Sequence, residues 1–497
     1  MSDGKNTLAT LAMSRGVEEQ AAQKGDDLMG RAARATVDWL MPQVSAGATI
    51  WVAAGVGNNG GDALLAASLL HERGFRVSLI VPTLPVSAAT QSALRQCEEQ
   101  GLPIWRERSE WQAQTVTSAP DWVIDGLLGI GLSRAPEGVF AELIDDLNAL
   151  SVPIVALDVP SGVDAQTGVV AGSAIRACFT LTFLYQKSGL WMGDGADCSG
   201  EVVLADLDFA SSSLIESDGR LNLHHEGTLS QLKRPRNSHK GRFGSVVVVG
   251  GHVGMVGAAI LAGRAAFSAG VGKVLLHLLD DRLVVDPMSP ELMMRGAMED
   301  VSGVNAVVIG PGLGQSEQSL AALMNVLSVM TPQQSLVVDA DALNLMAQHE
   351  SLRRDLIGRE SFAVLTPHPT EAARLLNIST VQIQANRIDA AQTLAKLYHS
   401  VVVLKGVGTV IASPDGAYCV NTTGGAALAV AGQGDVLSGL LAALLAMGGA
   451  PFEAACLAVY VHGMAGDDYT QAVQGTIGLS PSHMPQLISA VLNRLQA

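Results

Sequence analysis

Two glycine-rich loops, each closed by an aspartate, are the parts of this chain best suited to chemistry. One covers residues 57–62 and follows a short apolar stretch, and the other covers residues 431–435 and leads into a predicted helix. Glycine lets the backbone approach a ligand closely, and the free N–H groups at a helix start attract an anion such as phosphate. An aspartate repels phosphate, so Asp62 and Asp435 are better suited to binding a cation or removing a proton. The pair of loops therefore indicates two nucleotide-handling sites.

The first loop is one of three polar clusters in the first half of the chain, at residues 58–62, 125–131 and 158–164. Each follows an apolar run predicted as a strand, and ligands of an open parallel sheet bind at the carboxyl ends of strands. Asn59, Asp125 and Ser161 offer hard oxygen ligands for an alkali or alkaline-earth cation. Residues 129–134 contain two glycines and the positively charged side chain of Arg134, which together could hold a phosphate. The alternative is that glycine with Asp or Asn at a strand end only forms turns.

The second loop has a context that indicates phosphoryl transfer. A helix start at residues 432–435 would neutralise charge on a transferring phosphoryl group, while Asp435 takes the proton of the attacking hydroxyl. Residues 403–409 form a predicted strand that runs into a Gly/Thr turn, which suits the phosphates or sugar of a nucleotide. The alternative for Asp435 is an N-cap after a glycine turn.

Three more clusters follow predicted strands in the second half, at residues 310–314, 338–344 and 365–371. His368 lies between two prolines, which favours a ligand contact and leaves a structural role open. Asp339 and Asp341 suit Mg²⁺ bound through water, but they equally suit the closing of a strand-to-helix turn.

These loops require strands and helices that alternate, and the apolar pattern predicts them. Continuous apolar runs are typical of buried parallel strands, so both halves are predicted to be α/β with doubly wound sheets. Residues 7–41 are predicted to be helical, as are residues 435–461. The strand predictions are residues 50–54, 77–81, 122–124, 154–157 and 180–184, then 245–249, 273–279, 306–309, 336–338, 363–365 and 401–404.

The length of 497 residues predicts more than one domain. A polar stretch rich in Ser, His and Arg separates the halves, so we expect domains at 1–215 and 240–497 with a linker at 216–239. Residues 245–263 contain no Asp, Glu, Lys or Arg, but their five glycines and one histidine favour strand, loop and helix over a membrane span.

Composition restricts the partners. The net charge of −16 argues against nonspecific binding to nucleic acid or to an anionic membrane. The five cysteines are scattered and lack a CxxC spacing, which fits a reducing cytoplasm and excludes an obvious zinc site. Apolar helical surface leaves a homo-oligomer possible.

The first half resembles the YjeF N-terminal family of NAD(P)H-hydrate epimerases over about residues 15–210, through "GVGNNGGDALLAASLLHERGFRV", "DGLLGIGLSR" and "LDVPSGVDAQTG". The resemblance implies a Rossmann-like sheet and potassium bound by Asn59, Asp125 and Ser161. Asp158 is the candidate acid–base residue, with capping of the next turn as the alternative. The implied contacts to the damaged nucleotide are Asn58, Asn59, Gly60, Gly61, Asp62, Gly129, Ile130, Gly131, Leu132, Ser133, Arg134, Ala135 and Asp158.

The second half resembles the YjeF C-terminal family of ribokinase-like NAD(P)H-hydrate dehydratases over about residues 230–495, through "HKGRFGSVVVVGG", "GPGLG", "VVDADALN", "LTPHPTEAARLL", "KGVGT" and "GQGDVLSG". The resemblance implies phosphorylation of the ring hydroxyl by ADP and then loss of phosphate. The implied contacts to the hydrated nucleotide are Ala258, Gly312, His368 and Asp435. Those to the adenine nucleotide are Lys405, Gly406, Val407, Gly408, Thr409 and Gly434.

Together the two resemblances imply a bifunctional repair enzyme. The first half would interconvert the R and S hydrates of NADH and NADPH, and the second would dehydrate the S form. Two alternatives remain at this point: a ligand-binding scaffold for the first half, and an ordinary small-molecule kinase for the second. A kinase would leave a stable phosphate ester, whereas a dehydratase would leave inorganic phosphate and reduced nicotinamide.

Overall fold

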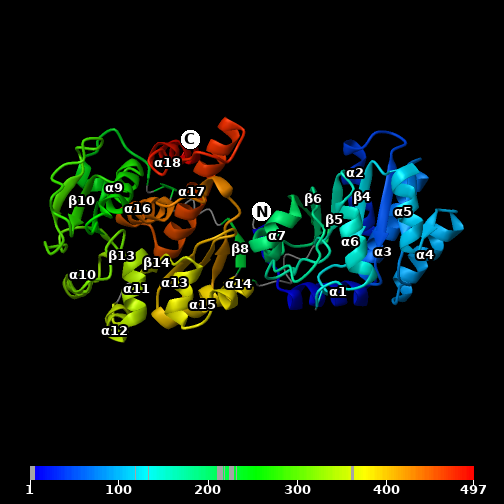
Figure 1. Ribbon diagram of the computed structural model, residues 1–497, viewed down its shortest axis with the longest axis horizontal. Helices are drawn as coiled ribbons and strands as arrows, with labels where there is room; N and C mark the ends of the chain where they lie inside the picture. Colours follow the sequence, from blue (N-terminus) through cyan, green and yellow to red (C-terminus); the bar gives the residue numbers. More distant parts are fainter. Residues whose placement is uncertain are drawn as a thin grey trace. The chain divides into compact units, whose positions relative to one another are not determined.

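The computed structural model describes residues 6–117, 119–132, 134–209, 217, 219–222, 229–230, 232–359 and 363–496. The chain divides into two compact units, Met1–Gly219 and Arg220–Ala497. Figure 1 shows the first in blue to green and the second in green to red. Each unit is built on its own sheet, and the prediction of an α/β fold in both halves is confirmed.

The first unit contains a seven-stranded sheet in which each strand runs parallel to its neighbours, in the order β3-β2-β1-β4-β5-β6-β7. The strands are β1 (Thr49–Ala54), β2 (Arg76–Ile80), β3 (Ile104–Trp105), β4 (Trp122–Gly126), β5 (Ile154–Leu157), β6 (Phe179–Phe183) and β7 (Glu201–Ala205). The helices are α1 (Leu11–Lys24), α2 (Leu28–Leu40), α3 (Asn58–Glu72), α4 (Ala88–Glu99), α5 (Arg108–Thr117), α6 (Val139–Asn148) and α7 (Gly193–Ser199).

Helices cover both faces of this sheet. Alternate residues of a strand point to opposite faces, so Ile50 and Val52 of β1 pack in a cluster with α2, α3 and α4. Trp51 and Ala53 pack on the other face, in a cluster with α5 and α6. Burial on both faces explains why the central strands are apolar throughout, and the sheet is doubly wound as predicted.

The predicted helix over residues 7–41 is interrupted. α1 ends at Gly25, which has the left-handed φ of 75° that commonly terminates a helix, and α2 begins after Asp27. Asp27 caps α2, because its Oδ1 accepts the N–H of Gly30 at 2.8 Å. The single-helix prediction was wrong because the apolar spacing continues across the break. The break matters, since it gives α1 a direction of its own.

The strand order places a topological switch between β1 and β4. Connections leave β1 toward β2 and β3 on one side, and the chain then returns to β4 and continues to β7 on the other. The loops that follow β1 and β4 therefore diverge and leave a crevice at the carboxyl edge of the sheet. The predicted clusters at residues 58–62 and 125–131 begin there.

The second unit contains a ten-stranded sheet in the order β11-β10-β9-β12-β13-β14-β15-β16-β17-β8. The strands from β11 to β15 are parallel, and β16 and β17 continue the sheet as antiparallel strands. The strands are β8 (Gly219–Leu221), β9 (Ser245–Gly250), β10 (Lys273–Leu278), β11 (Met293–Gly296), β12 (Ala306–Ile309), β13 (Ser335–Val338), β14 (Val364–Leu365), β15 (Val401–Leu404), β16 (Val410–Ala412) and β17 (Tyr418–Val420).

Helices surround this sheet (Figure 1), and α16 (Gln433–Ala446) lies at the centre of the hydrophobic core. They are α9 (Val256–Ser268), α10 (Glu317–Val329), α11 (Ala340–Gln348), α12 (Glu350–Ile357), α13 (Pro369–Leu376), α14 (Thr380–Ala385), α15 (Arg387–Tyr398), α16 (Gln433–Ala446), α17 (Pro451–Val473) and α18 (Met484–Gln496). α16 is buried at every position from Val436 to Ala446. A Cβ at Gly439 would lie 2.0 Å from the carbonyl oxygen of Ala262, so this glycine lets α16 pack tightly on α9.

The stretch at residues 245–263 forms β9 and the start of α9, which confirms the prediction of strand, loop and helix. Across the described residues, no helix combines the length and apolar character that crossing a bilayer requires. Within the expected linker at 216–239, residues 219–221 form β8. Residues 216, 218, 223–228 and 231 of that segment lie outside the described part of the chain.

Candidate active sites

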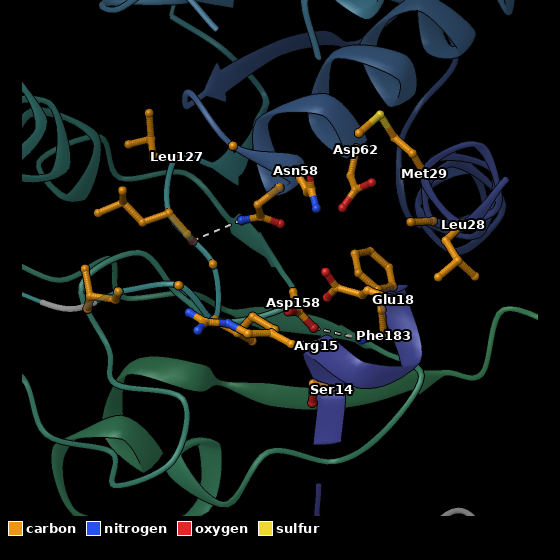
Figure 2. A pocket seen from close by; sticks show the side chains of 18 of the residues that line it. Ser14, Arg15, Glu18, Leu28, Met29, Asn58, Asp62, Leu127, Asp158 and Phe183 are labelled. Atoms are coloured by element: carbon orange, nitrogen blue, oxygen red, sulfur yellow. Dashed lines mark hydrogen bonds between the residues drawn. The ribbon is translucent and has the colours of Figure 1, made fainter. Parts of the chain in front are cut away.

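A cavity of about 830 Å³ opens at the switch point of the first unit. Of the thirteen predicted substrate contacts, ten line it: Asn58, Asn59, Asp62, Gly129, Ile130, Gly131, Leu132, Arg134, Ala135 and Asp158. Gly60 and Gly61 are buried in the first turn of α3, and Ser133 lies outside the described residues. The structure thus brings the loops after β1, β4 and β5 together around one space (Figure 2).

The first turn of α3 is free to receive an anion. Gly57 precedes the helix, and no side chain caps its N–H groups. Gly60 has no room for a side chain, because a Cβ there would lie 2.0 Å from the carbonyl oxygen of Gly55. The loop therefore holds its backbone close to β1, with uncapped N–H groups of the kind that bind phosphate.

Asn59, Asp125 and Ser161 form a buried oxygen-rich cluster beside the cavity. Ser161 donates its N–H and its hydroxyl to the carboxylate of Asp125, at 2.8 and 2.6 Å. Burial raises the pKa of Asp125 to about 6, although hydrogen bonds from Ser161 and Leu127 oppose the rise. Asn59 donates to the carbonyl of Leu128 at 3.0 Å, and its own Oδ1 is buried without a hydrogen-bond partner.

The donor set of this cluster fits a hard cation. A buried carboxylate held only by neutral donors and a buried amide oxygen without a hydrogen-bond partner are both features that a bound cation would satisfy. Oxygen ligands from a carboxylate, an amide and a hydroxyl suit a hard ion.

Asp158 lies at the floor of the cavity and is held by three groups. It follows β5 with a left-handed φ of 63°, which is uncommon for a residue with a side chain. Its Oδ1 accepts the N–H of Phe183 at 3.1 Å and the hydroxyl of Thr182 at 3.4 Å. The same oxygen forms a salt bridge with the ammonium group of Lys187. The side chains of Lys187 and Asp158 are 5% and 14% exposed, so the pair is little screened by water.

Lys187 is a site residue that the sequence analysis missed. Its ammonium group also donates to the carbonyl of Phe183 at 2.6 Å, which fixes it beside Asp158. The sequence did contain an indication of its role, because Lys187 lies in a short polar run just after a predicted strand, as the other site loops do.

Two further carboxylates face Asp158 across the cavity (Figure 2). Burial, followed by the charge of Asp158, raises the pKa of Glu18. Burial, followed by the charges of Asp158 and Glu18, raises the pKa of Asp62 well above its ordinary value. Glu18, on α1, was not predicted from the sequence. A lysine-paired Asp158 beside two carboxyl groups whose pKa values are raised is an arrangement suited to acid–base catalysis.

The second candidate site lies where β12, β13, β14 and β15 end. Lys405, directly after β15, forms a salt bridge of 2.9 Å with Asp339, directly after β13. Burial lowers the pKa of Lys405, but the charges of Asp339 and Glu371 outweigh it and leave that pKa raised. This ion pair, in which Asp339 is buried and the Lys405 side chain is 21% exposed, joins two of the predicted loops.

Asp435 lies in the first turn of α16, next to this pair. Gly432 begins the helix with a φ of 99°, and no side chain caps the N–H groups. Burial, reinforced by the charge of Asp339, raises the pKa of Asp435 to about 7. A Cβ at Gly434 would lie 3.1 Å from Nζ of Lys405. A cation, free N–H groups and a carboxylate poised near neutral pH therefore meet at one helix start.

Glu371 and His368 occupy the start of α13. Nδ1 of His368 accepts the N–H groups of Thr370 and Glu371, at 3.1 and 3.3 Å, and so caps the helix. Glu371 in turn accepts the N–H of His368 at 2.8 Å, and burial raises its pKa to about 7. Burial lowers the pKa of His368. The imidazole of His368 therefore caps α13, and its contact with substrate stays a prediction.

Ala258 and Gly312 lie against each other. Gly312, after β12, has a φ of 58°, and a Cβ there would lie 3.1 Å from Cβ of Ala258 on α9. Asp341, on α11, holds the loop that contains Gly312, because its carboxylate accepts the N–H of Gly314 at 2.8 Å. The four predicted contacts to the hydrated nucleotide thus come from elements that end at one edge of the sheet.

The predicted adenine-nucleotide loop begins with Lys405 and ends with Thr409. The hydroxyl of Thr409 donates to the carbonyl of Gly406 at 2.8 Å and closes the turn, whereas Val407 is 59% exposed. Gly408 has a φ of 64°. Arg387, which the sequence analysis missed, donates to the carbonyls of Leu404 and Lys405 at 3.0 and 3.2 Å.

Asp339 closes the strand-to-helix turn after β13, which was one of its two predicted roles, whereas Asp341 accepts the N–H of Gly314 in the loop after β12. Asp339 accepts the N–H of Ala340 at 2.9 Å as well as the ammonium group of Lys405. Within the described part of the chain, no three His, Cys, Asp or Glu side chains are grouped as a protein-only metal site.

Comparison with known proteins assigns the two halves of the chain to two families. Residues 25–189 match the family described as YjeF-related protein N-terminus, and residues 246–489 match the NAD(P)H-hydrate dehydratase family. The chain is 36% identical to the bifunctional NAD(P)H-hydrate repair enzyme Nnr of Coxiella burnetii, over 93% of this chain and 92% of that protein. It is 35% identical to the Nnr enzyme of Escherichia coli, over 89% and 84% of the two chains.

The chain belongs to the family of bifunctional NAD(P)H-hydrate repair enzymes. Among solved structures, it is similar to the ADP/ATP-dependent NAD(P)H-hydrate dehydratase of Bacillus subtilis co-crystallised with ATP and Mg²⁺. That likeness has 31% identity and a TM-score of 0.47, and it covers 54% of this chain and 96% of the other. The predictions of family and of a bifunctional repair enzyme are confirmed.

Proposed function

We propose that the two candidate sites divide one repair pathway between the two units. The cavity of the first unit interconverts the R and S hydrates of NADH and NADPH, within a domain of residues 1–215. The site at the start of α16 dehydrates the S form at the expense of ADP, within a domain of residues 240–497. The observation that carries this division is that each unit has its own carboxylate beside a lysine and an uncapped helix start.

In the epimerase site, Asp158 is the proposed proton acceptor. Inversion at the hydroxyl-bearing ring carbon requires one group that takes a proton and another that gives one. The ammonium group of Lys187 compensates the charge of Asp158, while the raised pKa values of Glu18 and Asp62 let them keep a proton to higher pH. The uncapped start of α3 and the loop that contains Arg134 provide for the phosphates.

We assign a potassium ion to Asn59, Asp125 and Ser161. The orphaned Oδ1 of Asn59 and the buried carboxylate of Asp125 support the assignment. When bound, the ion supplies positive charge beside the substrate's phosphates. The protein's part is to hold the loop after β4 against α3, through the hydrogen bond from Asn59 to Leu128.

In the dehydratase site, Asp435 is the proposed base for the ring hydroxyl. The hydroxyl oxygen attacks the terminal phosphorus of ADP as Asp435 takes its proton, and AMP leaves. Phosphate then leaves the ring carbon while the adjacent carbon loses a proton, which restores the reduced nicotinamide. The helix start and Lys405 face the charge that builds on the transferring group.

A Mg²⁺ ion is proposed to enter this site with the nucleotide. The carboxylates of Asp339 and Asp341 already accept hydrogen bonds, so the chain offers few free oxygens. Mg²⁺ commonly retains waters and binds substrate phosphates with only one or two carboxylates. In this protein it would supply phosphate charge neutralisation, while Lys405 and α16 orient the phosphoryl group.

The proposed setting is the cytoplasm, without nucleic acid or membrane as partner and with a homo-oligomer left possible. The five cysteines are free thiols, which suits a reducing compartment. The net charge of −16 disfavours polyanionic partners.

Product analysis tests the second half of this proposal. Pure S hydrate of NADH is incubated with the enzyme and ADP, and in parallel with ATP. The proposal expects equal amounts of inorganic phosphate and reduced nicotinamide, with ADP as the faster donor. Accumulation of a stable phosphate ester would instead identify a small-molecule kinase.

A further inference from the structure

The helix α1 forms one wall of the epimerase cavity, although nothing in its sequence marked it as part of a site. Ser14, Arg15, Glu18 and Ala22 line the cavity from this helix. Figure 2 shows Ser14, Arg15 and Glu18 reaching into the space that also contains Asn58 and Asp158. The wall exists because Gly25 separates α1 from α2 and lets it take its own direction.

The charges that line the cavity are mostly acidic. Its described acidic residues are Glu18, Asp26, Asp27, Asp62, Glu137 and Asp158, and its described cations are Arg15, Arg134 and Lys187. A dinucleotide carries its own negative pyrophosphate, so such a cavity needs available cations. Asp26 pairs with Arg31, and Lys187 is already engaged by Asp158. Among the described residues, neither Arg15 nor Arg134 takes part in a salt bridge.

Arg15 and Glu18 are three residues apart, so they lie on the same face of α1, about one turn apart. The charges of Arg15 and Asp158 both act on Glu18, which also shares a hydrogen bond with Asn58. Glu18 therefore faces the reacting end of the cavity, and Arg15 lies within reach of the same ligand one turn away. Asn58 begins α3, where the uncapped N–H groups offer a phosphate site.

We propose that Arg15 of α1 binds a phosphate of the hydrated nicotinamide nucleotide and positions the ring against Asp158. This assignment rests on the proposed epimerase function of the cavity. A planar guanidinium can bind two phosphate oxygens at once, which fixes orientation as well as affinity. α1 is thus a substrate-binding element, and Arg15 complements Arg134, which comes from the loop after β4.

The test compares two substrates that differ only in the phosphate. The R hydrates of reduced nicotinamide mononucleotide and of reduced nicotinamide riboside are epimerised by the full-length protein and by Arg15→Gln. Arg15→Lys, which keeps the charge, and Lys24→Gln are the matched variants. Lys24 lies in the last turn of α1, is exposed, and does not line the cavity.

Arg15→Gln is expected to lower kcat/KM for the mononucleotide hydrate roughly ten- to hundredfold, mainly through KM, and to leave the riboside hydrate unchanged. Arg15→Lys is expected to recover part of the loss, and Lys24→Gln is expected to match the wild type. An equal loss on both substrates would overturn the proposal, since it would indicate a structural role for Arg15. No loss on either would also overturn it. A wild-type protein that epimerises neither hydrate would instead contradict the proposed epimerase function.

Discussion

Asp435 and Asp158 are both carboxylates at strand or helix ends, yet their surroundings give them different properties. Burial raises the pKa of Asp435 to about 7, so its proton is exchanged near neutral pH. Asp158 has a buried lysine on its Oδ1, which compensates its charge directly. Each environment suits a proton acceptor, through burial at Asp435 and through a paired lysine at Asp158.

The rate of S-hydrate dehydration should therefore rise with pH through about 7. Asp435 must be ionised to accept a proton, and its raised pKa leaves it protonated below that value. The rate should fall about tenfold for each unit of pH below the pKa, and Asp435→Asn should abolish dehydration while epimerisation persists. A rate that stays constant into mildly acidic pH would contradict the role of Asp435 as the base.

Lys187→Gln should slow epimerisation by about 10²–10⁴-fold, because it leaves Asp158 buried without its cation. Lys187→Arg should restore part of the rate, and S-hydrate dehydration serves as the internal control in both variants. Loss of both activities would indicate general unfolding, and unchanged epimerisation would remove Lys187 from the site.

At the scale of elements, helix starts carry most of the proposed chemistry. α3 and α16 begin without side-chain caps and face the candidate ligand sites, whereas α13 begins with a full capping box between His368 and Glu371. The first N–H groups of α3 and α16 are therefore available to a ligand, whereas those of α13 already have side-chain acceptors. Nε2 of His368 lies 3.3 Å from Oε1 of Glu371, and the side chain is 48% exposed, so a substrate can reach this imidazole only on its exposed side.

Variants of His368 separate its two roles. His368→Ala should lower the free energy of unfolding by about 1 kcal/mol, because the N-cap is lost, and His368→Asn should restore it. If His368 also contacts substrate as predicted, His368→Asn should still raise KM for the S hydrate about tenfold. Thermal unfolding and steady-state kinetics check the two effects. Full activity of His368→Asn would leave His368 with the capping role alone.

The sequence predicted the central strands of both sheets well, because strands buried on both faces are continuously apolar. It missed β7 and β11, whose residues are all partly or fully exposed. It also missed β3, β8, β16 and β17, which have only two or three residues each. The glycine loops were predicted because the carboxyl ends of parallel strands meet at one edge. Lys187, Glu18 and Arg387 were not, since their place in the sites depends on side-chain contacts between elements far apart in the chain.

At the scale of the whole molecule, each unit has a complete candidate site of its own. The cavity at the switch point is lined by residues of the first unit alone, and the cluster around Asp435 belongs to the second. Independent sites suit a repair pathway in which one epimer must be converted before it can be dehydrated. They also allow each activity to be removed without the other.

Replacing potassium with tetramethylammonium should reduce epimerisation and leave dehydration of pure S hydrate unchanged. The large cation cannot enter the buried cluster of Asn59, Asp125 and Ser161, and the charge of Asp125 is then left uncompensated. Restored potassium should return the rate, and sodium gives a measure of size selectivity. Equal sensitivity of both activities, or of neither, would contradict the assigned cation site.

The most direct test of the two-site account follows the recovery of reduced-nicotinamide absorbance from an R/S mixture of NADH hydrate supplied with ADP. The wild-type enzyme should recover all of it. Asp158→Asn should recover the S fraction quickly and the R fraction only at a slow residual rate, and Asp435→Asn should recover none while still equilibrating the epimers. Complete and rapid recovery by Asp158→Asn, or loss of epimerisation in Asp435→Asn, would contradict the division of the reaction between two independent sites.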